Sequence, residues 1–205
     1  MRLGVDFDNT IACYDSVFQS RASSRGWLRP AEELTKDQVR DVVRALENGE
    51  VKWQQLQAEV YGPAMNEAEV IPGVEGVLRS CRERGIPVFI VSHKTQYARR
   101  DTTGTDMREA AHRWMSSRRF FSEDGLSIPE ANVFFESSRD DKVKRVARLG
   151  CTVFIDDLLE VLCHPRFPHG VQRILLDGGA RAETVQGILS ATSWEKIGCE
   201  LFGAT

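Results

Sequence analysis

Cysteine is scarce and scattered in this chain of 205 residues. The cysteines are odd in number and contain no Cys-x-x-Cys pair, which argues against a zinc site or a disulfide framework. They stand at positions 13, 81, 151, 163 and 199. Cys151 lies within an apolar run, and we interpret it as a small residue of the core.

Long apolar runs and a dominant charge are also missing. No stretch approaches the roughly 20 apolar residues that a membrane-spanning helix needs, and the first residues resemble a strand rather than a signal peptide. The net charge is -3 and the pI is about 5.9, which argues against a general surface for nucleic acid or anionic membranes. We therefore expect a cytoplasmic protein with no nucleic-acid or membrane partner. The sequence carries no signal for an oligomeric state.

What the chain does contain is enough apolar sequence for one sizeable core, with 41% hydrophobic residues. Apolar runs predict five strands, with helical patterns between them. The predicted strands cover residues 2–7, 86–91, 132–136, 151–155 and 171–176. Apolar residues at helical spacing cover 107–115 and 143–149, and Gly150 ends the second of these helices. This alternation predicts an α/β fold, a Rossmann-like parallel sheet of about five strands with helices on both faces.

The interval between the first two strands is too long for one crossover. Apolar residues at helical spacing occur over 39–46 and again over 53–60, and each stretch is followed by a break, at Asn48-Gly49 and at Gly62-Pro63. We interpret this interval as a small α-helical insertion after the first strand. The predicted domains are therefore a core of residues 1–12 and 71–205 and a helical subdomain of residues 13–70.

Polar residues capable of chemistry stand at or just after the ends of the predicted strands. Because ligands bind outside the carboxyl ends of parallel strands, we expect these residues to converge. Taken singly, each is also an ordinary turn former, helix cap or solvated charge, so their recurrence favours a shared site. They are Asp6, Asp8 and Thr10 after the first strand, Ser92, His93 and Lys94 after the second, and Asp156 and Asp157 after the fourth. Lys142 opens the helical pattern that precedes the fourth strand, and only the order of motifs described next makes it a candidate.

The order Asp-x-Asp-x-Thr, Ser, Lys, Asp-Asp resembles the four motifs of the haloacid dehalogenase-like (HAD) superfamily. The resemblance extends from Arg2 to about Asp157, which is most of the chain. It implies a phosphatase-type hydrolase, in which the helical insertion is a C1 cap that closes over the site and helps to choose the substrate. An added helical bundle with no gating role is the alternative.

The resemblance implies a role for each acid. Asp6 would be the nucleophile that forms an aspartyl-phosphate, and Asp8 would be the general acid that protonates the leaving oxygen and later activates water. Asp6 must then stay ionised, helped by a metal and by Lys142, while Asp8 must be able to hold a proton. Asp6, the main-chain carbonyl of Asp8 and Asp156 would hold Mg²⁺, with Asp157 either a second ligand or an outer acceptor.

The remaining residues are expected to bind substrate. Ser92 donates to phosphate oxygens and Lys142 supplies a positive charge to the transferring group. Thr10 is expected to hydrogen-bond near Asp8 and to lie at the substrate. His93 and Lys94 contact either a leaving group or a second anionic group, or else lie exposed to solvent.

The combined prediction is a Mg²⁺-dependent phosphatase acting on a small phosphomonoester, a sugar phosphate or a nucleoside monophosphate. Dehalogenases that resemble this fold lack an acid at the position of Asp8, because a halide leaves without a proton. A phosphomutase of the same fold is the first alternative. A receiver-like protein or a non-catalytic protein that binds a phosphorylated ligand is the second.

Overall fold

The computed structural model describes residues 1–29, 34–177 and 185–203, and within them the chain divides into two compact units. The sheet unit comprises Met1–Ala12, Val70–Lys94 and Arg118–Thr205, and the helical unit comprises Cys13–Glu69 and Thr95–Ser117. The helical unit thus includes Thr95–Ser117, which the sequence assigned to the core domain. The predicted domains also contain residues 30–33, 178–184 and 204–205, which lie outside the described residues.

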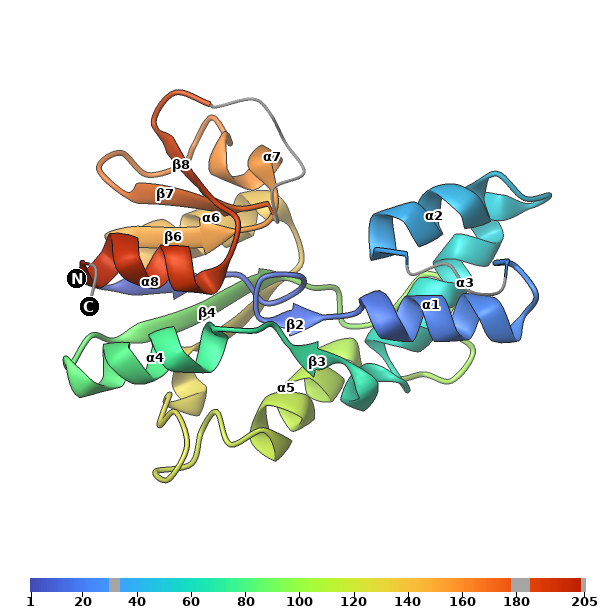
Figure 1. The fold of residues 1–205 in the computed structure, drawn as a ribbon, viewed down its shortest axis with the longest axis horizontal. Coiled ribbons are helices and arrows are strands. Elements are labelled where there is room, and N and C mark those ends of the chain that lie inside the picture. The colour runs from blue at the N-terminus through green and yellow to red at the C-terminus, as the bar shows by residue number, and fades with distance from the viewer. Residues whose placement is uncertain (30–33, 178–184, 204–205) are drawn as a thin grey trace. The chain divides into compact units, whose positions relative to one another are not determined.

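A parallel six-stranded sheet forms the centre of the sheet unit (Figure 1). Its strands lie in the order β5-β4-β1-β6-β7-β8, so that β1 is flanked by β4 and β6. The α/β fold and its five predicted strands are confirmed, and β8 is a sixth strand that the sequence analysis missed. Their bounds are β1 (Leu3–Val5), β4 (Val88–His93), β5 (Val133–Glu136), β6 (Val153–Asp156), β7 (Gln172–Leu176) and β8 (Ile188–Ala191).

Helices cover both faces of this sheet, as predicted. In Figure 1, α4 (Val74–Glu83) and α8 (Trp194–Phe202) lie on one face, and α6 (Arg139–Arg148) and the short α7 (Leu159–Leu162) lie on the other. A 3-10 helix at Glu130–Asn132 leads into β5. Strand order explains why α4 lies opposite α6 and α7, because right-handed crossovers that run toward opposite edges of a sheet place their helices on opposite faces. Helix α8 follows the last strand of the sheet and is not part of a crossover.

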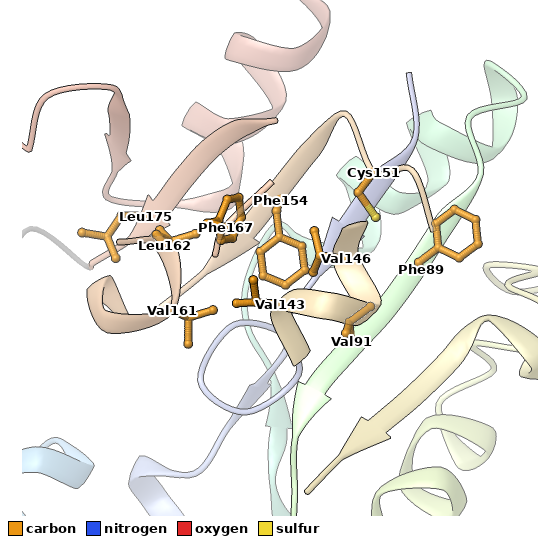
Figure 2. Packing of buried hydrophobic residues seen from close by; sticks show 10 residues of the cluster. All are labelled: Phe89, Val91, Val143, Val146, Cys151, Phe154, Val161, Leu162, Phe167 and Leu175. Carbon is orange, nitrogen blue, oxygen red and sulfur yellow. The ribbon is translucent and has the colours of Figure 1, made fainter. Parts of the chain in front are cut away.

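The core beneath α6 shows how tightly helix and sheet are packed (Figure 2). Val143 and Val146 of α6 pack with Phe154 of β6 and with Cys151, which is 4% exposed and is a core residue as predicted. Burying each such side chain contributes about 1.5–3 kcal/mol. Gly4 allows the close approach, because a Cβ there would lie 2.6 Å from the Phe154 ring.

The helical unit has its own apolar interior. The two helices predicted in the insertion are confirmed as α2 and α3, and the break between them is at Asn48, whose φ of 55° is left-handed. Phe18 stacks on Trp53 with ring centroids 4.9 Å apart. The elements of this unit are α1 (Asp15–Ser24), α2 (Lys36–Arg44), α3 (Gly49–Tyr61), a 3-10 helix at Met65–Glu67 and α5 (Met107–Ser117).

Helix α5 joins the helical unit because its buried stripe is used there. The Trp114 indole nitrogen, on that stripe, donates to the main-chain oxygen of Ala68 at 2.8 Å. A separate two-stranded sheet pairs β2 (Ala12–Cys13) with β3 (Glu69–Val70). Across the described part of the chain, no helix is both long enough and apolar enough to cross a membrane.

Candidate active site

Two buried carboxylates meet at the carboxyl edge of the sheet. Strand β1 ends at Val5, so Asp6 is the first residue beyond it, and Asp156 is the last residue of the neighbouring β6. The Asp6 amide donates to the main-chain oxygen of Ile155 at 2.9 Å, which continues the pairing of β1 with β6 up to the two acids. Asp6 is 4% exposed and Asp156 is fully buried. The predicted convergence of motif residues is therefore present at this edge.

Lys142 connects these two acids. Its ammonium nitrogen lies 2.5 Å from Oδ1 of Asp6 and 2.6 Å from Oδ2 of Asp156, and its side chain is only 1% exposed. Helix α6 positions it, because Ser138 caps the helix by accepting a hydrogen bond from the Asp141 amide at 3.1 Å. Lys142 then falls in the first turn, beside the strand ends. A lysine at a helix start is usually solvated, and here its burial marks it as part of the site.

The protonation states of Asp6 and Lys142 depend on their burial. Burial raises the pKa of Asp6 to about 7, against the opposing charge of Lys142, and the negative charges of Asp156 and Asp8 add to the rise. Burial would lower the pKa of Lys142, but Asp156 and Asp6 outweigh it and hold its pKa above the ordinary value. Lys142 is therefore charged at neutral pH, and a cation that binds Asp6 competes with a proton.

Three carboxylates at this edge could hold a metal ion. One oxygen each from Asp6, Asp156 and Asp157 lie within 4.8 Å of one another. The Leu158 amide donates to Oδ1 of Asp156 at 2.9 Å, and the Asn9 side-chain amide donates to Oδ2 of Asp157 at 3.2 Å. Hard carboxylate oxygens held by such donors suit Mg²⁺. The donor set fits the predicted magnesium site, and the role of Asn9 was not foreseen.

Asp8 stands apart from the three-carboxylate group and pairs with Lys94. The Lys94 ammonium lies 2.9 Å from Oδ1 of Asp8, and the Lys94 amide donates to the main-chain oxygen of Glu136. Lys94 is 4% exposed, so the alternative of a solvent-exposed lysine is wrong. Because Lys94 holds the side chain of Asp8, the metal ligand predicted from Asp8 is still its main-chain carbonyl.

The turn that carries the first motif is held from within. The amides of Ile11 and Ala12 both donate to the main-chain oxygen of Phe7, and Asn9 takes a left-handed φ of 58°. Asparagine tolerates this conformation better than most residues. The fully buried Thr10 donates its hydroxyl to Oδ2 of Asp6 at 3.4 Å. The expected partner of Thr10 was Asp8, and the structure corrects this to Asp6; its contact with substrate stays a prediction.

Ser92 and His93 are the last two residues of β4 rather than the residues after it. Ser92 is 1% exposed, whereas the alternation of a strand turns His93 to the exposed side. Partial burial of its ring lowers the pKa of His93, although a hydrogen bond with the main chain of Ser137 opposes this. The charges of Lys142 and Arg139 lower the pKa further, so the imidazole is neutral at neutral pH. Their contacts with substrate stay predictions.

Comparison with solved structures identifies the fold, although no protein-family model and no curated protein matches the chain. A HAD family hydrolase from Deinococcus radiodurans, with bound phosphate and sodium, is 16% identical, with a TM-score of 0.56 over 98% of this chain and 94% of that one. A dehalogenase with an intermediate complex is 13% identical, with a TM-score of 0.57 over 100% and 97%. The chain has the HAD-like fold.

A third similar structure of this fold contains magnesium. YfnB from Bacillus subtilis, bound to magnesium, is 11% identical, with a TM-score of 0.50 over 99% of this chain and 98% of that one. The matches cover nearly the whole chain, helical unit included. They include a dehalogenase beside a hydrolase with bound phosphate, so the reaction has to be argued from the side chains of this chain.

Proposed function

We propose that this protein is a Mg²⁺-dependent phosphatase that hydrolyses a small phosphomonoester through an aspartyl-phosphate on Asp6. The observation that carries this proposal is the buried lysine between two acids. Lys142 contacts both Asp6 and Asp156, while a third carboxylate, Asp157, completes an oxygen-rich group. With Mg²⁺ bound, such a group would balance the negative charge of a transferring phosphoryl group and place a nucleophile next to it.

The first half-reaction transfers the phosphoryl group to the protein. A carboxylate oxygen of Asp6 attacks phosphorus, the bond from phosphorus to the ester oxygen breaks, and Asp8 gives its proton to the departing oxygen. Lys142 faces the negative charge that develops on the phosphoryl oxygens. Lys94, 2.9 Å from Asp8, fixes the side chain that must reach the leaving oxygen.

The second half-reaction releases phosphate. Asp8, now a carboxylate, takes a proton from water as the water oxygen attacks phosphorus, and the bond to Asp6 breaks to regenerate its carboxylate. When bound, Mg²⁺ shields the negative charge of the phosphoryl oxygens and of Asp6. Asp6, Asp156, Asp157 and the Asp8 carbonyl are the ligands that we propose for it.

Asp8 favours a phosphatase over a dehalogenase. An alkoxide is a poor leaving group that needs a proton, whereas a halide leaves as a stable anion without one. The bound phosphate of the Deinococcus radiodurans structure and the magnesium of YfnB support this choice of chemistry. We propose that the helical unit serves as the cap that selects a sugar phosphate or nucleoside monophosphate.

The test is phosphate release from a panel of small phosphomonoesters, with Mg²⁺ and with EDTA. We expect metal-dependent turnover in the wild type and a loss of about 10³-fold or more in Asp6→Asn. Asp37→Asn is the matched control, because Asp37 is an aspartate of α2 whose side chain is 70% exposed. Halide release from a chlorinated carboxylic acid, with no phosphate release from any ester, would replace the phosphatase by a dehalogenase.

A second variant tests the role of Asp8. Asp8→Asn should slow an alkyl phosphate far more than p-nitrophenyl phosphate in the first half-reaction, because nitrophenolate leaves without a proton. The expected signature is a burst of nitrophenolate followed by slow turnover. If both esters slow equally in that first step, Asp8 is not the acid. If the folded wild type binds Mg²⁺ and releases no phosphate, a phosphomutase or a ligand-binding role would replace the phosphatase.

A further inference from the structure

A tryptophan from the last helix of the sheet unit holds the turn of the first motif. The indole nitrogen of Trp194 donates to the main-chain oxygen of Thr10 at 2.8 Å, across 184 positions in the sequence. Both residues are fully buried. Removing one partner of a buried hydrogen bond is costly, because the other partner stays buried and unsatisfied. This contact therefore restrains the main chain between Asp6 and the end of the turn.

Thr10 links this contact to the proposed nucleophile. Its carbonyl accepts from Trp194, and its hydroxyl donates to Oδ2 of Asp6 at 3.4 Å. The next carbonyl along the chain, that of Ile11, accepts from the Ile71 amide at 2.9 Å. Loss of the indole N–H would leave the Thr10 carbonyl without this donor, so that the peptide could shift. The Thr10 hydroxyl that orients Asp6 would then move as well.

The indole itself has little freedom to move. Trp194 is the first residue of α8, whose N-terminus is capped by Ser193. Gly73 packs against it with a left-handed φ of 86°, and a Cβ at Gly73 would lie 2.8 Å from the Trp194 Cβ. Because this donor is held firmly, it fixes the position of the turn, in the same way that outer hydrogen-bond partners fix the orientation of a reactive group.

We propose that Trp194 is a positioning residue of the active site, which acts through Thr10 to orient Asp6. This inference rests on the proposed function, since it assigns Asp6 the nucleophilic role. Trp194 lies beneath the turn, where it orders the reacting group without touching a substrate. A misplacement of about 1 Å at a reacting centre can cost 10²-fold in rate, so a partial loosening should cost about tenfold.

The helical unit supplies a matched control. Trp114 makes the same kind of contact, an indole nitrogen 2.8 Å from the main-chain oxygen of Ala68, and is 1% exposed. Replacing either tryptophan by phenylalanine keeps an aromatic ring and removes the N–H donor. Trp194→Phe and Trp114→Phe should therefore lower the melting temperature to a similar degree while only Trp194→Phe changes the chemistry.

The first measurement compares steady-state kinetics of these two variants. We expect kcat to fall about tenfold in Trp194→Phe with KM little changed, and both constants to stay within about twofold of the wild type in Trp114→Phe. Equal kcat values in the two variants, at equal loss of stability, would overturn the proposal and leave Trp194 a core residue only.

A double-mutant cycle then asks whether the effect passes through Thr10. Thr10→Val removes the hydroxyl that reaches Asp6 and keeps the main-chain carbonyl. If Trp194 acts through this hydroxyl, Trp194→Phe should lower kcat less than about threefold in the Thr10→Val background, against about tenfold in the wild type. Effects that multiply independently would contradict the proposal.

A readout without turnover separates this proposal from the proposed function. The chain has four tryptophans, and single phenylalanine variants of Trp27, Trp53 and Trp114 assign the fourth ¹⁵N-labelled indole resonance to Trp194 by elimination. We expect Mg²⁺ to shift the Trp194 resonance and leave that of Trp114 in place, and calorimetry to show weaker Mg²⁺ binding in Trp194→Phe alone. If the wild type releases no phosphate, the proposed function fails, but these shifts still test whether Trp194 is coupled to the acidic group around Asp6. Equal shifts, or none at Trp194, would overturn it even if Trp194→Phe does not fold.

Discussion

The two units differ in whether they bury charged side chains, because the buried charged residues among those that the structure describes all belong to the sheet unit. In the sheet unit, Lys142, Asp6 and Asp156 form contacts in which no side chain is more than 6% exposed. In the helical unit, the ion pair of Arg21 with Glu67 joins side chains that are 27% and 47% exposed. Burying charges costs several kcal/mol per ion before pairing offsets it, whereas half-exposed pairs cost and contribute little.

The helical unit is instead stabilised by aromatic side chains. Tyr14 contacts Tyr61 edge to face, with ring centroids 4.9 Å apart, and Phe18 stacks on Trp53 at the same distance. Such pairs contribute about 0.5–1.5 kcal/mol beyond the burial of their area. This difference supports the sheet unit as the place of the proposed chemistry, because costly buried charges cluster at functional sites.

The largest effect should follow the loss of the buried cation. Lys142→Met leaves two acids facing one another without their ammonium, so we expect kcat to fall about 10³-fold and the free energy of unfolding to fall by about 3 kcal/mol. Kinetics and urea denaturation measure the two. Lys144→Met, on the same helix with a side chain that is 43% exposed, is the control. Similar results for the two lysines would erase the contrast between buried and exposed charge.

A large but purely structural effect is expected in the helical unit. Trp53 is 2% exposed and stacks on Phe18, so Trp53→Ala should lower the free energy of unfolding by about 3–5 kcal/mol through the cavity that it leaves. Denaturant titration of the variant measures this loss. Mg²⁺ binding by the folded variant should match the wild type. Weaker Mg²⁺ binding would show that the two units do not divide their tasks as proposed.

An intermediate effect is expected from pH. The folded-state pKa of Asp6, about 7, exceeds the unfolded value of 3.8, so without metal its contribution to stability falls as the pH rises between them. Because Mg²⁺ and the proton compete for Asp6, the gain in melting temperature caused by Mg²⁺ should be larger at about pH 8 than at about pH 6. Thermal denaturation at both pH values checks this. In Asp6→Asn the dependence should disappear, and a larger gain at the lower pH would refute the competition.

The smallest effect is expected at the surface of the helical unit. Arg40 of α2 pairs with Asp37 and Asp41, whose side chains are both 70% exposed. Arg40→Met should change the free energy of unfolding by less than about 1 kcal/mol and leave kcat unchanged. Denaturant titration and steady-state kinetics check both statements. A loss comparable to that in Lys142→Met would mean that exposure does not determine how much an ion pair contributes to the free energy of unfolding.

The sequence was most informative where the pattern was local. The apolar runs predicted five of the six strands of the parallel sheet, and strand ends in such a sheet bring their next residues together, so Asp6 and Asp156 were candidates from their positions at strand ends. Strand β8 was missed because Ile188–Ala191 has only two large apolar residues before Ser190, and so lacks the apolar run that marks the equally short β6. Helix α5 was found, but which unit it packs in depends on tertiary contacts such as that of Trp114 with Ala68.

Pairings between distant residues could not be predicted in the same way. Lys94 was a candidate for substrate binding, and only the folded chain shows that it reaches Asp8, 86 positions away. Thr10 was assigned to the wrong acid, because side chains at the start of a tight turn can point to either neighbour. Trp194 gave no signal at all, since a tryptophan at a helix start is most often a core residue.

The place of β1 in the sheet has a consequence for how the chain is made on the ribosome. Strand β1 emerges before its sheet neighbours β4 and β6, which begin at Val88 and Val153. Asp6 therefore stays hydrated until Lys142 has been synthesised, and its turn has no indole donor until Trp194 follows. A nascent chain arrested before α8 should therefore contain the sheet partners of β1 without an ordered acidic site, because the indole that holds the turn comes from α8.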